Sequence, residues 1–315
     1  MKAAIAFVAV ALFTQSCSKE VDFTGSTSMQ SSHENVVTGA IIGNQEVIEL
    51  PKDELNNQTQ ALLYLPKEYK QTNENYPLII SLHGMGAAGT DISVIMKASS
   101  LADNISKGFV PEAINPVDHK LYKFITVSPQ APQWSYGATN IKAMLPALIK
   151  RYRIDTTRIY VVGYSAGGYG TWTCATDDTS LIKRIAAIVP MDAAGIEKAV
   201  KVDGVVIKRY DNLRNVSTYD LPVWNICGED DQFWSIAVDY TNKINSLNPT
   251  IPVKLTGLPG VGHSGWVQGY DPKWRVDGMN IYEWMLQYTR TRVAEKAREV
   301  KLGITNVRVQ PREEG

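Results

Sequence analysis

A serine in a glycine-rich turn is the strongest chemical signal in the sequence. Residues 163–167 read Gly-Tyr-Ser-Ala-Gly, a G-x-S-x-G pattern with Ser165 at its centre. The apolar residues 159–162 predict a strand buried on both faces, and the small residues from Gly168 onward predict a helix. A strand, a sharp turn and a helix are the context in which this pattern exposes a nucleophile. We therefore interpret Ser165 as a nucleophile rather than as an incidental loop serine.

Two backbone N–H groups are the expected partners of this serine. Residues 77–82 form a second apolar run that leads into residues 83–86, His-Gly-Met-Gly. The glycines let the chain bend so that the N–H of Met85 faces the serine, and the N–H of Ala166 supplies a second donor. Such a pair stabilises the negative charge that develops on a carbonyl oxygen under attack. His83 is expected to be a structural residue, hydrogen-bonded behind this loop.

A histidine and a carboxylate are needed to activate the serine, and both follow it in the required order. His263 is the one histidine after Ser165, and it follows the last predicted strand. Glu229, Asp230 and Asp231 all follow the preceding strand, so each is a candidate acid. The carboxylate accepts a hydrogen bond from the imidazole Nδ1–H, while Nε2 takes the serine proton. Serine, acid and histidine at successive strand ends predict a catalytic triad.

A dinucleotide-binding enzyme is the alternative from another class. Residues 84–89 match G-x-G-x-x-G and follow a predicted strand. That fingerprint also needs an acidic residue about 20 positions later, at the end of the next strand, to bind the ribose. The next predicted strand, 123–128, ends in Pro129-Gln130, and residues 260–265 repeat the pattern in a chain with 23 glycines. The sequence therefore disfavours dinucleotide binding, and we expect no cofactor.

Strand and helix patterns alternate along the chain and must position these residues. The predicted strands cover residues 40–50, 60–65, 77–82, 123–128, 159–162, 185–191, 221–228 and 253–258. The predicted helices cover residues 91–101, 138–152, 168–175, 235–247 and 279–292. Residues 108–120 are expected to be irregular, and residues 192–219 to form a connection or small cap. This alternation predicts an α/β fold with a mostly parallel central sheet and helices on both faces.

Composition narrows the class of protein. The chain has 315 residues, of which 44% are apolar and 20% charged, enough for one large domain with a buried core. Lysine plus arginine equals aspartate plus glutamate at 32 each, which gives no reason to expect a nucleic-acid partner or an electrostatically bound membrane surface. The four histidines are scattered, so no metal site is predicted.

The first 17 residues resemble an export signal rather than part of the fold. Lys2 precedes an apolar run, residues 3–13, that is too short to span a bilayer. The run ends near Cys17, as in bacterial lipoproteins, where such a cysteine carries the lipid; Thr14 departs from the leucine preferred in these signals. A plain signal peptide cleaved near Ser16 is the alternative. We expect a cell-envelope lipoprotein at the outer membrane or cell surface, and otherwise a periplasmic or secreted protein.

The rest of the chain divides by composition into three parts. Residues 18–38 are polar and are expected to be a flexible tether, residues 39–292 a catalytic domain, and residues 293–315 a charged tail. Cys174 falls in a predicted helix and Cys227 at the end of a predicted strand. We expect two buried free thiols, with a disulfide as the alternative in an exported protein.

Side chains in the loops next to the triad are candidate substrate contacts. These candidates are Gln130, Trp134, Tyr136, Trp234 and Trp266. They lie in or beside loops at the edge where an α/β sheet binds ligands, and aromatic faces stack on sugar rings and phenolic groups alike. The alternative is that these side chains only pack the core.

The sequence resembles the esterase branch of the α/β-hydrolase superfamily. It is most similar to secreted carbohydrate esterases of the feruloyl and acetylxylan type and to polyhydroxybutyrate-depolymerase-like esterases. The similar segments are residues 64–66, 77–86, 128–130, 158–172, 221–231 and 262–263. The family pattern places the acid three residues after a strand-end glycine, which implies Asp231. Cys227 departs from the histidine common at its position, a change expected to affect packing more than chemistry.

The function implied is acyl transfer from an ester to water, with Ser165, His263 and Asp231 as the triad and Met85 and Ala166 as the oxyanion hole. The resemblance implies esters of plant-type polysaccharides or their oligomers, carrying a feruloyl or acetyl group. Three alternatives stay open: a general short-chain carboxylesterase, a peptidase of the same fold, and a glycan-binding surface lipoprotein without catalysis. No nucleic-acid partner is expected, and the membrane is contacted only through the lipid anchor.

Overall fold

Alternating apolar side chains in the central strands build the fold around two hydrophobic cores. In β8 (Ile154–Tyr164), Ile159 and Val161 belong to one cluster of buried residues, whereas Tyr160 and Val162 belong to another. Successive side chains of a strand point to opposite faces of a sheet, so both faces are covered here. The apolar run that precedes the serine therefore lies in a central strand that is buried on both faces, as predicted.

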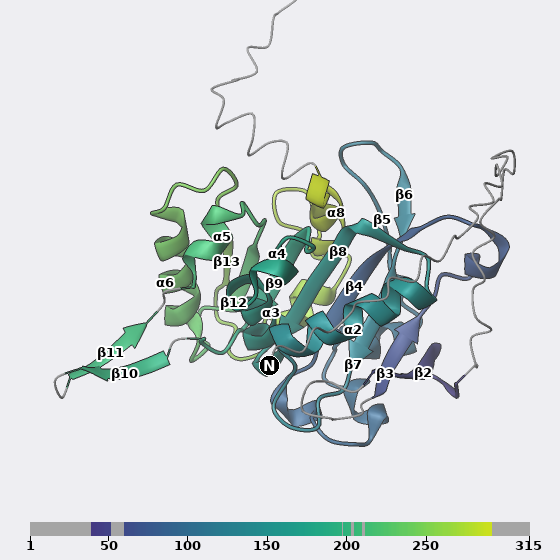
Figure 1. Ribbon diagram of the computed structural model, residues 1–315, viewed down its shortest axis with the longest axis horizontal. Helices are drawn as coiled ribbons and strands as arrows, with labels where there is room; N and C mark the ends of the chain where they lie inside the picture. The colour runs from purple at the N-terminus through teal and green to yellow at the C-terminus, as the bar shows by residue number, and fades with distance from the viewer. Residues whose placement is uncertain (1–38, 52–59, 197, 203–204, 210–211, 292–315) are drawn as a thin grey trace, which may run out of the picture. The chain divides into compact units, whose positions relative to one another are not determined.

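The computed structural model describes residues 39–51, 60–196, 198–202, 205–209 and 212–291 (Figure 1). All of them lie in the unit Val36–Gly315. The predicted export signal with Cys17, the tether and the charged tail lie outside the described residues. Within the described ranges, no helix is long and apolar enough to cross a membrane.

The main sheet has nine strands among the described residues, in the order β1-β2-β3-β7-β4-β8-β9-β12-β13. From β7 to β13 every neighbouring pair is parallel, whereas the pairs from β1 to β7 are antiparallel. This confirms the prediction of a mostly parallel sheet. The strands are β1 (Ile41–Ile42), β2 (Gln45–Glu49), β3 (Gln60–Tyr64), β4 (Tyr76–Leu82), β7 (Ile125–Pro129), β8, β9 (Ala187–Met191), β12 (Trp224–Gly228) and β13 (Lys254–Leu258). Two separate hairpins are formed by β5 (Glu112–Ile114) with β6 (Leu121–Lys123) and by β10 (Lys198–Val202) with β11 (Val205–Arg209).

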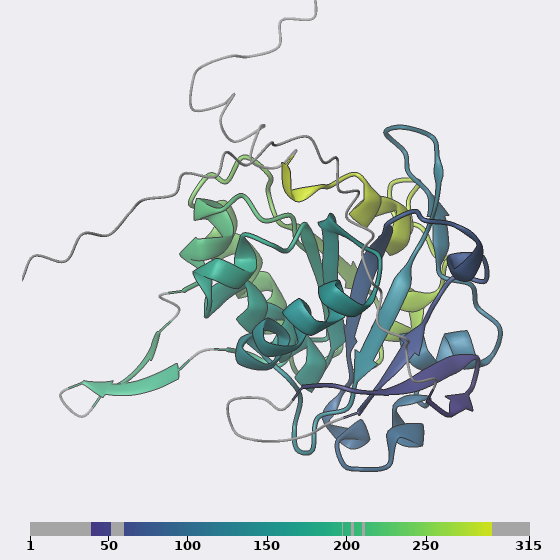
Figure 2. The ribbon, with the colours of Figure 1, turned by 45° about the vertical axis from the view of Figure 1, so that its right-hand side comes forward.

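Helices cover both faces of the sheet (Figures 1 and 2). The helices are α1 (Leu101–Ser106), α2 (Ala138–Arg151), α3 (Ala166–Thr176), α4 (Thr179–Ile182), α5 (Arg214–Thr218), α6 (Trp234–Asn245), α7 (Trp266–Tyr270) and α8 (Ile281–Leu286). Buried residues of α2, α3 and α6 join one core cluster. Buried residues of α1, α7 and α8 join the other. The two layers leave the ends of the parallel strands as the places where loops can form a site.

Three predicted segments differ from the structure. The helix predicted for residues 91–101 was wrong: a short 3₁₀ turn, η3 (Ile92–Ile95), is followed by two residues with positive φ, and α1 begins only after Ser100. The Ser100 side chain caps α1 by accepting a hydrogen bond from the Asp103 N–H at 3.1 Å. Residues 108–120 are not irregular throughout, because β5 begins there. The last helix is shorter than predicted, ending at Leu286.

The two cysteines of the described residues are both free and buried. Burial raises the pKa of each thiol above its ordinary value. The expectation of two buried free thiols is therefore confirmed, and the disulfide alternative is wrong.

Candidate active site

The turn that carries Ser165 is strained in the way that a nucleophile elbow requires. Ser165 has φ +55° and ψ −118°, between the end of β8 and the start of α3. A Cβ added at Gly163 would lie 2.4 Å from the Gly167 carbonyl oxygen, and one added at Gly167 would lie 2.1 Å from the Leu82 carbonyl oxygen. Only glycine fits at these two places, so the G-x-S-x-G spacing is imposed by the contact of helix, turn and neighbouring strand.

One chain of hydrogen bonds joins the three predicted catalytic residues. Ser165 Oγ lies 2.9 Å from His263 Nε2, and His263 Nδ1 lies 2.8 Å from Asp231 Oδ2. The second carboxylate oxygen of Asp231 accepts from the Phe233 N–H at 3.0 Å. The Asp231 side chain is fully buried, whereas that of His263 is 34% exposed. With its proton on Nδ1, the imidazole can accept the serine proton at Nε2.

Backbone hydrogen bonds align the loop of the acid with the loop of the histidine. The Glu229 N–H donates to the Leu258 carbonyl and the Asp230 N–H to the Val261 carbonyl, both at 3.0 Å. The side chains of Glu229 and Asp230 are exposed. The structure therefore brings only Asp231 of the three candidate acids to His263, which agrees with the position that the family resemblance implied.

Two aromatic rings hold the imidazole from its sides. Phe233 and Trp266 both pack edge-on against His263, with ring centroids at 5.4 Å and 5.2 Å. The Trp266 indole N–H donates to the Ala98 carbonyl at 2.8 Å, which fixes that ring. The orientation of the base thus depends on packing as well as on its two hydrogen bonds.

The two predicted oxyanion donors both begin a helical turn beside Ser165. Met85 is the first residue of the 3₁₀ turn η2 (Met85–Ala87), and Ala166 is the first residue of α3. The first N–H groups of a helix have no acceptor within it, so they are available to a substrate oxygen. A Cβ built on Gly84 would lie 3.4 Å from the Ser165 Cβ, which shows how closely the two turns approach.

His83 supports the oxyanion loop from behind. Its Nδ1 lies 2.7 Å from the Gly84 carbonyl, and its Nε2 accepts from the Ala131 N–H at 2.9 Å. Burial lowers the pKa of His83, and the hydrogen bond to Gly84 opposes that shift. A neutral imidazole with both nitrogens bonded to backbone agrees with the structural role expected for it.

The G-x-G-x-x-G pattern at residues 84–89 does not have the geometry of a dinucleotide site. After β4 the chain enters the three-residue turn η2 and then η3, rather than one long helix. The fingerprint needs a helix N-terminus directly behind the glycines to receive the pyrophosphate. The structure therefore gives no support to the dinucleotide alternative.

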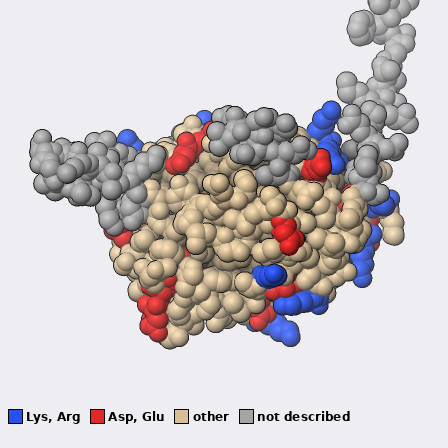
Figure 3. All heavy atoms as spheres, turned by 90° about the horizontal axis from the view of Figure 1, so that it is seen from below, with Lys and Arg blue, Asp and Glu red and all other residues tan. Residues whose placement is uncertain are grey.

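An apolar cavity of about 360 Å³ opens next to Ser165. Its wall is formed by Gly84, Met85, Gly86, Ala87, Val94, Lys97, Ala98, Tyr164, Ser165, His263 and Trp266. The carboxyl ends of the parallel strands, which adjoin this cavity, lie at the bottom of Figure 1. Figure 3 shows the molecule from below, and this side carries few charged side chains near its middle. The cavity suits an apolar group attached to the carbonyl that Ser165 would attack.

Of the five predicted substrate contacts, only Trp266 lines this cavity. Gln130 is 3% exposed and donates to the carbonyls of Ala87 and Asp91 at 3.0 Å and 2.8 Å, so it braces the oxyanion loop. Tyr136 is 5% exposed and belongs to the core. The pocket-lining prediction is corrected for both, because their side chains are used inside the fold.

The other two tryptophans lie outside the cavity wall. Trp134 is 44% exposed, has φ +54° and packs edge-on against Tyr169. Trp234 begins α6 and lies over Gly257 of β13. Trp134 remains available to a substrate that extends beyond the cavity, whereas Trp234 packs on the sheet.

Sequence reasoning missed three kinds of site residue. Lys97 and Ala98 line the cavity from the loop that was predicted to be helical. Tyr164, the second residue of the elbow pattern, stacks on Trp266 with a centroid distance of 4.5 Å. Asp192 is fully buried near Asp231, and its position directly after the predicted strand 185–191 was the signal that could have found it.

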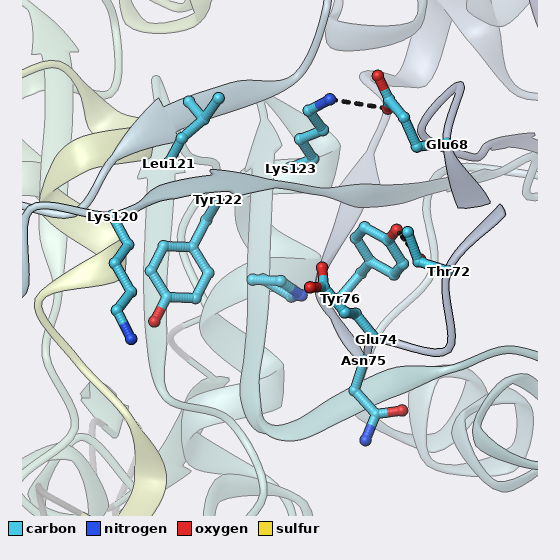
Figure 4. A pocket seen from close by; sticks show the side chains of 10 residues that line it. Glu68, Thr72, Glu74, Asn75, Tyr76, Lys120, Leu121, Tyr122 and Lys123 are labelled. Carbon is cyan, nitrogen blue, oxygen red and sulfur yellow. Dashed lines mark hydrogen bonds and ion pairs between the residues drawn. The ribbon is translucent and has the colours of Figure 1, made fainter.

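A larger cavity, of about 540 Å³, lies at the opposite edge of the sheet, where β4 begins (Figure 4). Its wall includes Lys123, which forms an ion pair with Glu68 at 2.7 Å, and Tyr76, whose hydroxyl is 2.7 Å from the Thr72 hydroxyl. None of the predicted catalytic residues lines it. Size alone therefore does not identify the cavity that lies beside the predicted catalytic residues.

Comparison with known proteins agrees with this geometry. The Esterase family model matches residues 53–278, more than half of the chain. No curated protein sequence matches the chain. Among solved structures, a thermostable esterase has a TM-score of 0.57 and 21% identity, over 79% of this chain and 64% of its own. A ferulic acid esterase has a TM-score of 0.51 and 17% identity, over 79% of this chain and 99% of its own.

An S-formylglutathione hydrolase from Staphylococcus aureus is also similar, with a TM-score of 0.50 and 15% identity over 79% of this chain and 99% of its own. At these identities the solved structures show a shared fold, which is the predicted α/β-hydrolase fold. The family match covers the elbow, the acid and the histidine. The chain therefore belongs to the Esterase family and has the α/β-hydrolase fold.

Proposed function

We propose that the protein hydrolyses carboxylic esters through a covalent acyl-enzyme on Ser165. The observation that carries this proposal is the continuous chain of hydrogen bonds from Ser165 Oγ through His263 to the buried carboxylate of Asp231. A serine hydroxyl is a weak nucleophile by itself and needs an adjacent base whose orientation is held by a third group. All three parts are present beside a cavity that can hold the acyl group.

The reaction follows from the positions of these groups. Ser165 Oγ attacks the ester carbonyl while His263 Nε2 takes its proton, and the oxyanion accepts hydrogen bonds from the N–H groups of Met85 and Ala166. His263 then gives the proton to the leaving alcohol oxygen as the carbon–oxygen bond breaks. Water adds to the acyl-enzyme by the same steps, which releases the acid and restores the serine. Asp231 stabilises the imidazolium that forms in each half of the reaction.

We propose an ester of a plant-type polysaccharide or its oligomers as the natural substrate, with a feruloyl or acetyl acyl group. The apolar wall with Trp266 favours an aromatic acyl group, because a volume of about 360 Å³ far exceeds what an acetyl group occupies. The exposed ring of Trp134 is available to stack on a sugar. One protein of similar fold is a ferulic acid esterase, which supports the same choice.

Comparing kcat/KM for methyl ferulate, an acetylated xylo-oligosaccharide and a plain butyrate ester tests this choice. We expect methyl ferulate to be the best of the three. Because Trp266 also packs on His263, we expect Trp266→Ala to lower kcat/KM for every ester, and for methyl ferulate about tenfold more than for the other two. Trp234→Ala is the matched control, since that ring packs on β13 away from the cavity. A butyrate preference of an order of magnitude that survives Trp266→Ala would leave a general short-chain carboxylesterase.

An amide substrate distinguishes an esterase from a peptidase of the same fold. We expect esters to be cleaved and peptide amides of the same acyl group to be left intact. Labelling of wild type, but not of Ser165→Ala, by a fluorophosphonate would demonstrate the nucleophile independently of any substrate. Equal labelling of wild type and Ser165→Ala would contradict the proposed mechanism.

We also propose that the protein is exported and anchored to the cell envelope by a lipid on Cys17. The support is the order of a charged residue, an apolar run and a cysteine in residues 1–17. Metabolic labelling with a fatty-acid analogue should mark wild type and not Cys17→Ser. Unchanged membrane fractionation and processing of Cys17→Ser would refute the anchor.

A further inference from the structure

Asp192 is held against the nucleophile by the backbone on both of its sides. It directly follows β9, is fully buried and has φ +41°, a conformation that few residues other than glycine adopt. The Ser165 N–H donates to the Met191 carbonyl at 3.0 Å, and the Ala194 N–H donates to the Ser165 carbonyl at 3.2 Å. An aspartate at positive φ beside the nucleophile is uncommon, and the hydrogen bonds on both sides of it stabilise this conformation.

The carboxyl group of Asp192 is satisfied on one oxygen only. Oδ1 accepts from the Gly228 N–H at 2.8 Å, whereas Oδ2 is buried with no hydrogen-bond donor among the described residues. Carboxyl oxygens of Asp192 and Asp231 and a ring nitrogen of His263 all lie within 4.8 Å of one another. A Cβ on Gly265 would lie 3.0 Å from both Asp192 oxygens, so a glycine gives the carboxyl its room.

The groups around Asp192 Oδ2 explain how it can be satisfied. The titratable groups facing it are the Cys227 thiol from β12, the Asp231 carboxylate from the loop after β12, and His263 from the loop after β13. Within the described ranges no lysine or arginine forms an ion pair with it. Burial above all, and then the neighbouring Asp231 carboxylate, raise the pKa of Asp192 to about 6, whereas hydrogen bonds from the Gly228 N–H and the Cys227 thiol oppose that shift. A proton on Asp192 turns the unsatisfied oxygen into a donor.

We propose that Asp192, as a neutral carboxylic acid, donates a hydrogen bond from Oδ2 to the Asp231 carboxylate and so positions Asp231 for His263. The proposal rests on the proposed esterase mechanism, in which His263 is the base. Asp192 touches neither the substrate nor the serine hydroxyl, so it is a positioning residue. The site then contains Ser165, His263, Asp231 and Asp192 in one line of hydrogen bonds, with one proton shared between the two carboxyl groups.

Loss of the proton from Asp192 changes the charge close to His263, the base. Once the shared proton is lost, a second negative charge lies near His263 and favours its protonated form. Replacing Asp192 by asparagine removes that charge but keeps a side-chain donor for Asp231. We therefore expect Asp192→Asn to move the acid limb of kcat/KM to lower pH by about half a unit or more. Asp230→Asn, at an exposed carboxyl on the same loop, should leave the limb in place.

The stability of the wild-type protein relative to Asp192→Asn should also depend on pH. The folded-state pKa of Asp192 lies above its ordinary value of 3.8, so the stabilising neutral form is fully present below about pH 4 and is lost as the pH rises through about 6. Asparagine is neutral throughout this range. The Tm of Asp192→Asn relative to wild type should therefore rise between about pH 4 and pH 6 and then level off.

The kinetic comparison uses alanine and asparagine at position 192 in the full chain. Measured at about pH 5–6, where Asp192 keeps its proton, Asp192→Ala leaves Asp231 without its donor and should reduce kcat about tenfold with little change in KM, while Asp192→Asn should restore most of that loss. A role in packing alone would give similar losses for both variants and an unshifted pH profile. That result would overturn the proposal.

Infrared spectroscopy of the wild-type protein tests the proton without a variant of Asp192. A carbonyl-stretch band from a protonated carboxyl group should persist at about pH 5 and disappear above about pH 7, as expected for a raised carboxyl pKa. A wild-type spectrum without such a band would contradict the proposal even if the variants failed to fold. Ser165→Ala should keep the band and lose turnover, so failure of the esterase mechanism and failure of the Asp192 assignment give different results.

Discussion

The main sheet differs in chemistry between its amino edge, where the parallel strands begin, and its carboxyl edge, where they end. At the amino edge, a cavity of about 540 Å³ is lined by charged and hydroxyl side chains, several of them paired with one another (Figure 4). At the carboxyl edge, a cavity of about 360 Å³ is mainly apolar, and the polar groups beside it keep unused hydrogen-bonding capacity. Ser165 and Asp192, both with positive φ, belong to the second edge only.

The contrast agrees with our proposal that reactivity at the carboxyl edge comes from groups that the fold leaves incompletely satisfied. Exposed ion pairs at the amino edge are screened by water and contribute little. At the carboxyl edge, loops from parallel strands bring a strained serine, two helix-start N–H groups and two buried carboxyl groups into a small volume. Electrostatic interactions are stronger around the two carboxyl groups because these groups are buried. Substitutions at the two edges should therefore differ by orders of magnitude in their effect on turnover.

Ser165→Ala should give the largest effect. We expect ester turnover to fall on the order of 10³-fold or more with the fold unchanged, because no other nucleophile is activated by His263. The measurements are kcat on an aryl ester and circular dichroism of the same sample. A variant that keeps a tenth of wild-type kcat would remove the distinction between the two edges.

Asp231→Asn should rank second, with a loss in kcat of about 10²-fold or more. The amide can present its NH₂ group to Nδ1, which stabilises the wrong tautomer of His263. Asp230→Asn and Glu229→Gln, whose side chains are exposed on the same loop, should stay within about twofold of wild type. If Asp230→Asn proved the crippled variant, the acid would have to be reassigned.

His83→Ala should have an intermediate effect, and it compares two histidines at the same edge. Its loss leaves the Ala131 N–H without an acceptor behind the oxyanion loop. We expect a cost of about 1–3 kcal/mol in the free energy of unfolding and a moderate fall in kcat. The acid limb of kcat/KM should not move, because His83 is not the base. A shifted limb would show that His83 takes part in the chemistry.

Glu68→Gln should have the smallest effect. This variant removes the ion pair with Lys123 at the amino edge, where both side chains are partly exposed. We expect kcat/KM and Tm to match those of wild type, since exposed pairs contribute little. The check is the full kinetic comparison on the substrates used for Trp266→Ala. A selective loss on the oligosaccharide ester would reveal a substrate-binding role for the amino-edge cavity.

The pattern of residue types was sufficient to predict the class of fold and the three residues that the hydrogen bonds join, Ser165, His263 and Asp231. Local rules operate at the elbow: the run 159–162 must be buried on both faces, and no side chain larger than hydrogen fits at Gly163 or Gly167. The position of His263, after the last predicted strand, could also be recognised from a short segment of sequence. Periodicity and glycine spacing are properties of short segments, so they can be recognised in a single sequence.

Tertiary structure alone decided which polar and aromatic side chains meet. Gln130 and Tyr136 were predicted to contact substrate. The Gln130 side chain instead donates to two backbone carbonyls, and the Tyr136 side chain packs in the core. Asp192 and Ala98 lie near the triad because separate strands end at one edge, and both need positive φ that nothing in their own sequence requires. Burial, contact across strands and competition for hydrogen bonds depend on residues far apart in the chain, and only the folded arrangement brings those residues together.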